Sequence, residues 1–255
     1  TDGNDDPATW DERHNPIGID RLQQEKITRY GAGQEKNRNL GISMAWWDPE
    51  SRDEEHTDGM VASKIVELIR EKKDKAFFLA AGFFNPHCPY VAPKKYFDEL
   101  PMDQVELPIN KPGDLDDIPE GGQIMAETRR KDLRMIEAHD DLQHCVQSYL
   151  ASIAHADTMV GELMDAFDGS AYSENTIVVL WSDHGYAFGE KDHYAKNTLW
   201  ERSTHVPFIM MVPGVTQAGS RTDSPVDLTC LYPTLTKLCG LPVPVGLDGV
   251  DVGPL

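Results

Sequence analysis

The sequence predicts an α/β fold in which helices cover both faces of a sheet. Three short apolar runs, residues 76–84, 176–181 and 206–212, support this prediction. None of these runs alternates between apolar and polar residues, a pattern typical of strands that are buried on both faces. Segments with helical spacing precede the first run and lie between the first and second runs, as in a sheet connected by helices.

Residues 1–56 are polar and show no sustained period, so we predict an irregular segment on the surface. A core of strands and helices is expected to follow over residues 57–255. Its first helix begins at Thr57 or Asp58, either of which can cap a helix, and ends in the basic run at residues 70–75. The apolar residues of this helix fall on one face: Val61, Ile65, Leu68 and Ile69.

Three further elements follow the first apolar run. Acidic residues, prolines and glycines fill residues 98–122, which predicts a long surface excursion. Apolar residues at helical spacing predict a second helix from about Asp141 to Phe167. Residues 226–242 predict a short helix with Pro233 close to its start.

The composition fits one large α/β domain or two small ones, because 255 residues can bury a sizeable core. The formal net charge of -19 argues against nucleic acid or an anionic membrane surface as a partner. An anionic substrate would need a local cluster of cations or a metal ion. No apolar run approaches the ~20 residues that cross a bilayer.

The four cysteines show no C-x-x-C spacing, which argues against a zinc ribbon or a thioredoxin-like motif. We expect free and largely buried thiols, with a Cys230–Cys239 disulfide as the alternative. The sequence begins with Thr1 in a polar stretch and ends just after an apolar run, so we expect both ends to be cut. The sequence therefore gives no information on a targeting signal.

Polar side chains follow two of the apolar runs, and loops at the carboxyl ends of strands form the active site in open α/β sheets. His87 follows the first run, and Asp183 and His184 follow the second. Because the chain leaves the strand at Asp183, the adjacent Asp and His can both turn toward one ion. We interpret this pair as ligands of a divalent metal. The alternatives are a cap or turn role for Asp183 and histidines bonded only to the backbone.

The loop between the second and third runs holds further candidates. A lysine can pair with an oxygen of sulfate or phosphate. We expect Lys191 to be an ordinary solvated lysine, and the spacing does not decide the role of Lys196. His193 lies between them, and His205 lies just before the third run, where it can equally be a structural histidine. The nucleophile-elbow, P-loop and H-E-x-x-H motifs are absent from the sequence. The residues alone thus predict a metal-assisted hydrolase.

Four stretches carry a family resemblance: FFLAAGFFNPHCPY, QSYLASIAHADTM, SDHGYAFGEKDHYAKNTLW and VDLTCLYPTLTKLCG. In this order they resemble the sulfatase family, and most closely its iduronate-2-sulfatase-like branch. The resemblance covers roughly residues 57–255. It implies an alkaline-phosphatase-like fold that is incomplete at the N-terminus here. In that fold a mixed sheet flanked by helices carries a calcium ion at its carboxyl edge.

The resemblance also implies roles for individual residues. Asp183 and His184 would be calcium ligands, with Mg²⁺ or another divalent ion as the alternative because calcium prefers oxygen ligands. His87 would contact the sulfate and protonate the leaving oxygen, and Lys196 would hold the sulfate. His193 and His205 are candidates for the substrate pocket.

The family nucleophile is a formylglycine, made from the first residue of a C/S-x-P-x-R motif. None of the four cysteines lies in such a motif, because the stretch that begins at Cys88 reads CPYVA. The resemblance therefore implies that the formylglycine lies upstream and that this chain is a partial catalytic domain. We expect the isolated chain to be inactive and to need the remainder of the domain.

The expected reaction is hydrolysis of a sulfated sugar or another small sulfate ester. Family members act in the periplasm, the extracellular space or the lysosome, and we expect the same here. Two alternatives stay open. One is a phosphoesterase or phosphonate hydrolase of the same superfamily, with a Ser or Thr nucleophile and transition metals. The other is a non-catalytic binding protein that has kept the fold and lost the nucleophile.

Overall fold

The computed structural model describes residues 8–29, 45–71 and 74–253 of the chain. These residues form two compact units. The first unit contains the chain up to Glu174 together with Tyr186–Thr204, and the second contains Asn175–Gly185 and the chain from His205 onward. Helices and short strands occur in both units, which confirms the predicted α/β class.

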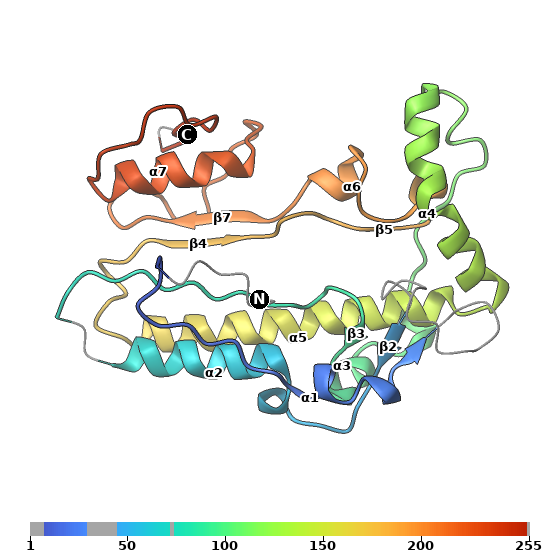
Figure 1. Cartoon of the computed structure of the whole chain (residues 1–255), viewed down its shortest axis with the longest axis horizontal. Coiled ribbons are helices and arrows are strands. Elements are labelled where there is room, and N and C mark those ends of the chain that lie inside the picture. The colour runs from blue at the N-terminus through green and yellow to red at the C-terminus, as the bar shows by residue number, and fades with distance from the viewer. Residues whose placement is uncertain (1–7, 30–44, 72–73, 254–255) are drawn as a thin grey trace. The chain divides into compact units, whose positions relative to one another are not determined.

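Two predicted helices form the frame of the first unit. Helix α2 (Thr57–Arg70) packs against the long helix α5 (Leu142–Asp168), and both keep nearly the predicted bounds (Figure 1). The N-terminus of α2 is its most deeply buried part, because Thr57, Asp58 and Gly59 are all buried. The predicted apolar face of α2 is only half-buried.

A third long helix, α4 (Glu120–Ala138), was not predicted. It begins after Pro119 and carries a run of charged residues that hides its apolar face in the sequence. Ala126, Leu133 and Ile136 share that face, and each is fully buried. The helix therefore belongs to the core, although the preceding residues form the predicted surface excursion.

Short strands and helical turns complete the first unit. The predicted irregular segment contains the buried strand β2 (Ala45–Trp47), in which Ala45 and Trp46 are each 2% exposed. This part of the prediction was wrong, because three residues are too few to show a period. Strand β2 pairs antiparallel with β1 (Thr28–Arg29) and parallel with β3 (Tyr90–Val91).

The remaining elements of this unit are short, and their bounds are as follows: α1 (Ile19–Leu22), η1 (Gln24–Lys26), η3 (Asp53–Glu55), α3 (Lys94–Asp98), η4 (Met102–Gln104), β5 (Ala187–Phe188), η5 (Glu190–Asp192), β6 (Tyr194–Ala195) and α6 (Glu201–Thr204). Strands β5 and β6 form an antiparallel pair.

An aromatic cluster fills the core of the first unit. The rings of Tyr149, Tyr186, Phe188 and Tyr194 lie with centroids 4.8 to 5.6 Å apart. The hydroxyls of Tyr90 and Tyr194 are 3.5 Å apart, and burial raises the pKa of both well above the usual value. This cluster joins β3 to the β5–β6 hairpin.

The apolar run at residues 76–84 does not form the buried strand that the sequence predicted. It is an extended segment, and Phe78 is 69% exposed. A strand needs a neighbouring strand for its amide and carbonyl groups, and no strand of the described residues pairs with this run. Its aromatic side chains instead pack against two other rings. The ring centroids of Phe78 and Trp10 are 5.7 Å apart, and those of Phe77 and Tyr172 are 5.0 Å apart.

The second unit contains the two other predicted strands. Strand β4 (Val178–Trp181) pairs antiparallel with β7 (Phe208–Met211), with Val178 opposite Met211. Both predicted strands are confirmed. The prediction that they are buried on both faces was wrong, because Trp181 is 50% exposed and Ile209 is 61% exposed. Half-buried and exposed residues alternate along β7, so one face of this two-stranded sheet is covered and the other is open.

The predicted C-terminal helix is present as the turn η6 (Leu228–Cys230) followed by α7 (Leu231–Leu238). All four cysteines are free, so the alternative of a Cys230–Cys239 disulfide is wrong. Cys239 is exposed, whereas the other three are buried as expected. Within the described ranges, no helix is long and apolar enough to cross a membrane.

Candidate active site

The loop that carries His87 is anchored from α2. The carboxylate of Asp58 accepts hydrogen bonds from the amides of Phe84, at 2.7 Å, and Asn85, at 2.8 Å. Asp58 is 3% exposed, and burial raises its pKa to about 6, although both amides favour the ionised form. Two backbone donors and one buried carboxylate thus fix the point at which the apolar run ends and the loop begins.

His87 lies on the exposed side of this loop, between two cis peptide bonds at Asn85-Pro86 and Cys88-Pro89. Its amide donates to the carbonyl of Phe84 at 2.8 Å. Its ring Nδ1 lies 2.6 Å from the carbonyl oxygen of Cys88, which can only accept, so Nδ1 carries the proton. The other ring nitrogen, Nε2, can therefore take up a proton and release it.

Behind the loop lies a cluster of buried histidines that the sequence did not reveal. Asn85 donates its side-chain amide to Nδ1 of His155 at 2.9 Å, and His155 is fully buried. The ring of His56 meets His155 edge-on with centroids 5.3 Å apart, and its Nε2 lies 2.8 Å from the hydroxyl of Ser51. Burial lowers the pKa of His56, and that of His155 to about 4. Burial thus favours the neutral form of both rings, and His155 supports the loop through its hydrogen bond from Asn85.

Lys196 directly follows β6 and belongs to the same unit as His87. Burial raises the pKa of the Cys88 thiol, and the positive charges of Lys196 and Arg129 partly oppose this effect. The Lys196 ammonium is thus near enough to act on the residue next to His87. His87 and Lys196, for which the sequence predicts catalytic roles, thus both lie in the first unit, and whether their side chains act on one substrate stays a prediction.

His193 and Lys191 precede this lysine in the chain, and each contacts at least one main-chain oxygen. His193 is 1% exposed, with Nδ1 3.2 Å from the carbonyl of Ala126 and Nε2 3.0 Å from the carbonyl of Lys196. Lys191, which was expected to be solvated, instead bonds to Asp114 through a carboxylate oxygen at 2.8 Å and the carbonyl at 3.0 Å. Whether His193 lines a substrate pocket stays a prediction.

Asp183 and His184 lie in the second unit, directly after β4. The amide of His184 donates to Asp183 Oδ1 at 3.0 Å, and its Nε2 lies 3.3 Å from Asp183 Oδ2. Nδ1 of His184 faces the carbonyl of Gly185 at 2.9 Å, so Nε2 is the ring nitrogen that would bind an ion. The side chain of Asp183 is 80% exposed. His205, also in the second unit, is exposed just before β7.

The pair fits part of a divalent-ion site. A carboxylate and an imidazole on adjacent residues can bind one ion together, but calcium takes six to eight oxygen ligands. In the part of the chain that the structure describes, no group of three or more His, Cys, Asp or Glu side chains is arranged to hold a metal. Asp183 and His184 would therefore need further ligands to complete a site.

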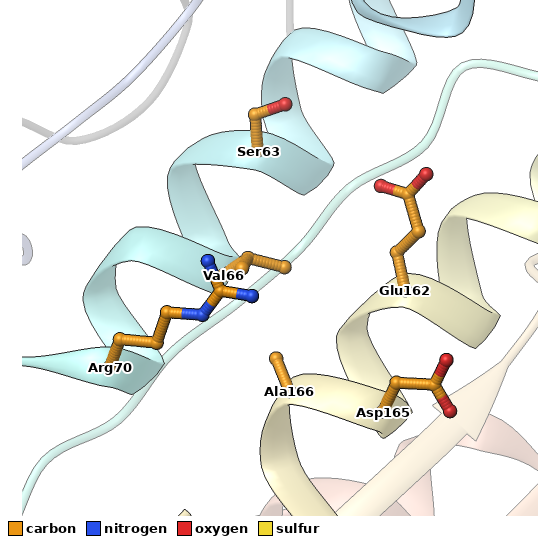
Figure 2. Close-up of a pocket in the computed structure, with 6 residues that line it drawn as sticks. All are labelled: Ser63, Val66, Arg70, Glu162, Asp165 and Ala166. Carbon is orange, nitrogen blue, oxygen red and sulfur yellow. The ribbon is translucent and has the colours of Figure 1, made fainter. Parts of the chain in front are cut away.

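A pocket of about 470 Å³ lies between α2 and α5, and none of the predicted site residues lines it (Figure 2). Arg70 lies on its α2 side, whereas Glu162 and Asp165 lie on its α5 side. Burial raises the pKa of Glu162, and nearby Asp53 adds to the effect. Two carboxylates against one guanidinium make this pocket unsuitable for an anionic ester.

Relatives of the chain share its sequence over most of its length. A family model described as sulfatase matches residues 10–241. A sulfatase from Formosa agariphila is 34% identical, over 88% of this chain and 45% of its own length. Iduronate 2-sulfatase from Mus musculus is 31% identical, over 73% of this chain and 40% of its own length. The chain thus spans less than half the length of these two relatives.

Solved structures show the same fold at lower identity. A phosphonate monoester hydrolase from Silicibacter pomeroyi has a TM-score of 0.69 at 21% identity, covering 80% of this chain and 42% of that chain. A protein solved in complex with its substrate D-glucosamine-2-N,6-O-disulfate has a TM-score of 0.60 at 19% identity, covering 78% of this chain and 51% of that one. These likenesses show the fold alone, whereas the family match confirms the predicted family. The chain belongs to the sulfatase family.

Proposed function

We propose that the protein is a sulfuric ester hydrolase that acts on a sulfated carbohydrate or another small sulfate ester. The observation that carries this proposal is the sulfatase family match, and the effect of the Lys196 charge on the Cys88 thiol, next to His87, supports it. A sulfated sugar is the preferred substrate class because one protein of this fold was solved with a disulfated glucosamine as its substrate.

Two residues of the first unit would carry the chemistry. The Lys196 ammonium would pair with a sulfate oxygen and stabilise the negative charge that grows there. His87 would hold a proton on Nε2 and release it to the oxygen of the leaving alcohol. The contact between its Nδ1 and the Cys88 carbonyl keeps Nε2 turned outward for this step.

We propose a divalent ion, calcium or alternatively Mg²⁺, at Asp183 and His184. When bound, such an ion would neutralise charge on the sulfate oxygens. The nucleophile in this proposal is a formylglycine, and no Cys or Ser of the 255 residues begins a C/S-x-P-x-R motif. We therefore expect the isolated chain to be inactive and use the complete protein for every test.

Cell fractionation tests the expected location outside the cytoplasm or in the lysosome, and recovery in the cytosol would contradict it.

The experiment measures kcat/KM of the complete protein on sulfated mono- and disaccharides, an aryl sulfate, and phosphate and phosphonate monoesters. Lys196→Ala should lower kcat/KM on the best sulfate ester by roughly 10²- to 10³-fold, the usual effect of losing one charge-stabilising group. Lys131→Ala removes an exposed lysine of α4 and is the matched control, expected to keep full activity.

Full activity of Lys196→Ala would remove Lys196 from the site. A clear preference for phosphonate or phosphate esters would favour the phosphoesterase alternative. Cleavage of no ester at all would favour the binding homologue.

A further inference from the structure

The segment that carries Lys196 has an unusual backbone. Lys191, Asp192, Ala195 and Asn197 all have positive φ angles between 51° and 77°, although none of them is glycine. Residues with a Cβ avoid this region because of steric strain, and such strain persists only when surrounding contacts hold it in place. Lys196 itself lies between two of these residues, so the direction of its side chain depends on those contacts.

Helix α4 supplies one set of contacts. The carboxylate of Asp192 pairs with the guanidinium groups of Arg130 and Arg134, which lie one helical turn apart. The amide of Phe188 donates to the Glu190 carboxylate at 2.9 Å and fixes the start of the turn. These contacts hold residues 188–192, but none of them reaches Lys196.

His193 supplies a contact that does reach Lys196. Its ring is almost completely buried and lies between two carbonyl oxygens, that of Ala126 on α4 and that of Lys196. A carbonyl can only accept, so a neutral ring donates to one of them at a time and an imidazolium to both. The contact to Lys196, at 3.0 Å, is the shorter one.

We propose that His193 is a positioning residue, whose Nε2–H bonds the main-chain carbonyl of Lys196 and so aims the Lys196 ammonium at the loop of His87. This inference rests on the proposed function, because it assigns His193 to the same site. His193 touches no substrate in this arrangement, since its ring is covered on the side of Lys196 and on the side of α4. It acts through the backbone of the lysine.

Two amide replacements separate the two contacts of the ring. The side-chain nitrogen of glutamine reaches about as far as Nε2, and that of asparagine about as far as Nδ1. His193→Gln therefore keeps the donor to Lys196, whereas His193→Asn keeps only the donor to Ala126. Each variant keeps one side-chain donor to one of the two carbonyls, so their melting temperatures should be similar.

The activities should differ even though the stabilities agree. His193→Asn should lower kcat/KM on a sulfate ester by about tenfold or more, and His193→Gln should keep it within about threefold, because small displacements of a catalytic group are costly. In the Lys196→Ala background, His193→Asn should change kcat/KM by less than about twofold, since an effect that acts through Lys196 disappears with it. A merely structural role would persist in that background.

Equal losses in the two His193 variants, or a loss by His193→Asn that persists without Lys196, would overturn the inference. If Lys196→Ala kept full activity, the assignment of Lys196 would fail and the inference with it. If Lys196→Ala lost activity while His193→Asn did not, only the inference would fail.

If neither His193 variant folds, Asp192→Asn tests the same segment. Asparagine tolerates the positive φ of this position but weakens the pairing with Arg130 and Arg134. Asp192→Asn should lower kcat/KM on a sulfate ester, as is expected for His193→Asn. This effect should also vanish in the Lys196→Ala background. An undiminished effect there would again overturn the inference.

Discussion

Replacement of Asp58 by asparagine should make the stability of the protein less dependent on pH. Asp58 is buried at the N-terminus of α2, and burial raises its pKa from 3.8 to about 6 in the folded protein. The folded state therefore holds this proton more tightly than the unfolded state does. The stability that the group contributes is fully present below pH 3.8 and is lost as the pH rises through about 6.

The magnitude follows from the two pKa values. A difference of about two pH units corresponds to roughly 3 kcal/mol of unfolding free energy. Asparagine does not titrate, so wild type should lose up to roughly 3 kcal/mol relative to Asp58→Asn between pH 4 and pH 7. All groups common to both proteins cancel in this difference.

The assay is urea unfolding of the complete protein at pH 4, 5, 6 and 7 and constant ionic strength, followed by tryptophan fluorescence. Asp58→Ser is the control, because it also does not titrate, and its single oxygen sits on a shorter side chain and reaches the amides of Phe84 and Asn85 less well than the asparagine oxygen does. It should be less stable than Asp58→Asn by a constant amount, with the same pH dependence relative to wild type. A wild type that gained stability relative to both variants as the pH rose would refute the reasoning, because the two amide donors would then outweigh burial.

Three further predictions concern other parts of the chain. Burial lowers the pKa of His155 from 6.5 to about 4. The stability that the neutral ring contributes to the folded protein is therefore fully present above pH 6.5 and is lost as the pH falls toward 4. Relative to His155→Gln, wild type should lose roughly 3 kcal/mol over that range in urea unfolding, and a constant difference would contradict this. Leu133→Ala should lower the unfolding free energy by about 2 to 5 kcal/mol. Ile124→Ala, at a 64% exposed position of the same helix, is the control and should change it by less than about 0.5 kcal/mol. Similar losses in the two variants would show that α4 does not pack through Leu133. Asp183→Ala should lower metal content and activity together, and unchanged metal content by elemental analysis would overturn the ligand assignment.

Local sequence patterns were sufficient for three of the four described α-helices of eight or more residues. The bounds of α2, α5 and α7 follow from apolar residues at helical spacing and from terminal residues, which act within a few turns of the chain. Helix α4 was missed because its charged residues outnumber the apolar ones that face the core. Its burial depends on the aromatic cluster that it packs against, and that cluster is assembled from distant segments.

The strands show the same limit more clearly. An apolar run can be read in a sequence, but whether it becomes a strand depends on a neighbour. Strands from residues 176–181 and 206–212 pair with each other. Residues 76–84 have no partner strand among the described residues and form no strand. Hydrogen bonds between strands are non-local, so the same pattern gives a sheet in one place and an unpaired segment in another.

The candidate site divides in the same way. The sequence by itself determined the adjacency of Asp183 and His184 after a strand, and its motifs determined the family and the choice of His87 and Lys196. Only the tertiary structure brought the Lys196 charge to the Cys88 thiol, anchored the His87 loop on Asp58, and buried His193 beneath Lys196. The physical reason is that pKa shifts, buried hydrogen bonds and tolerated backbone strain arise from contacts between segments that are far apart in the chain.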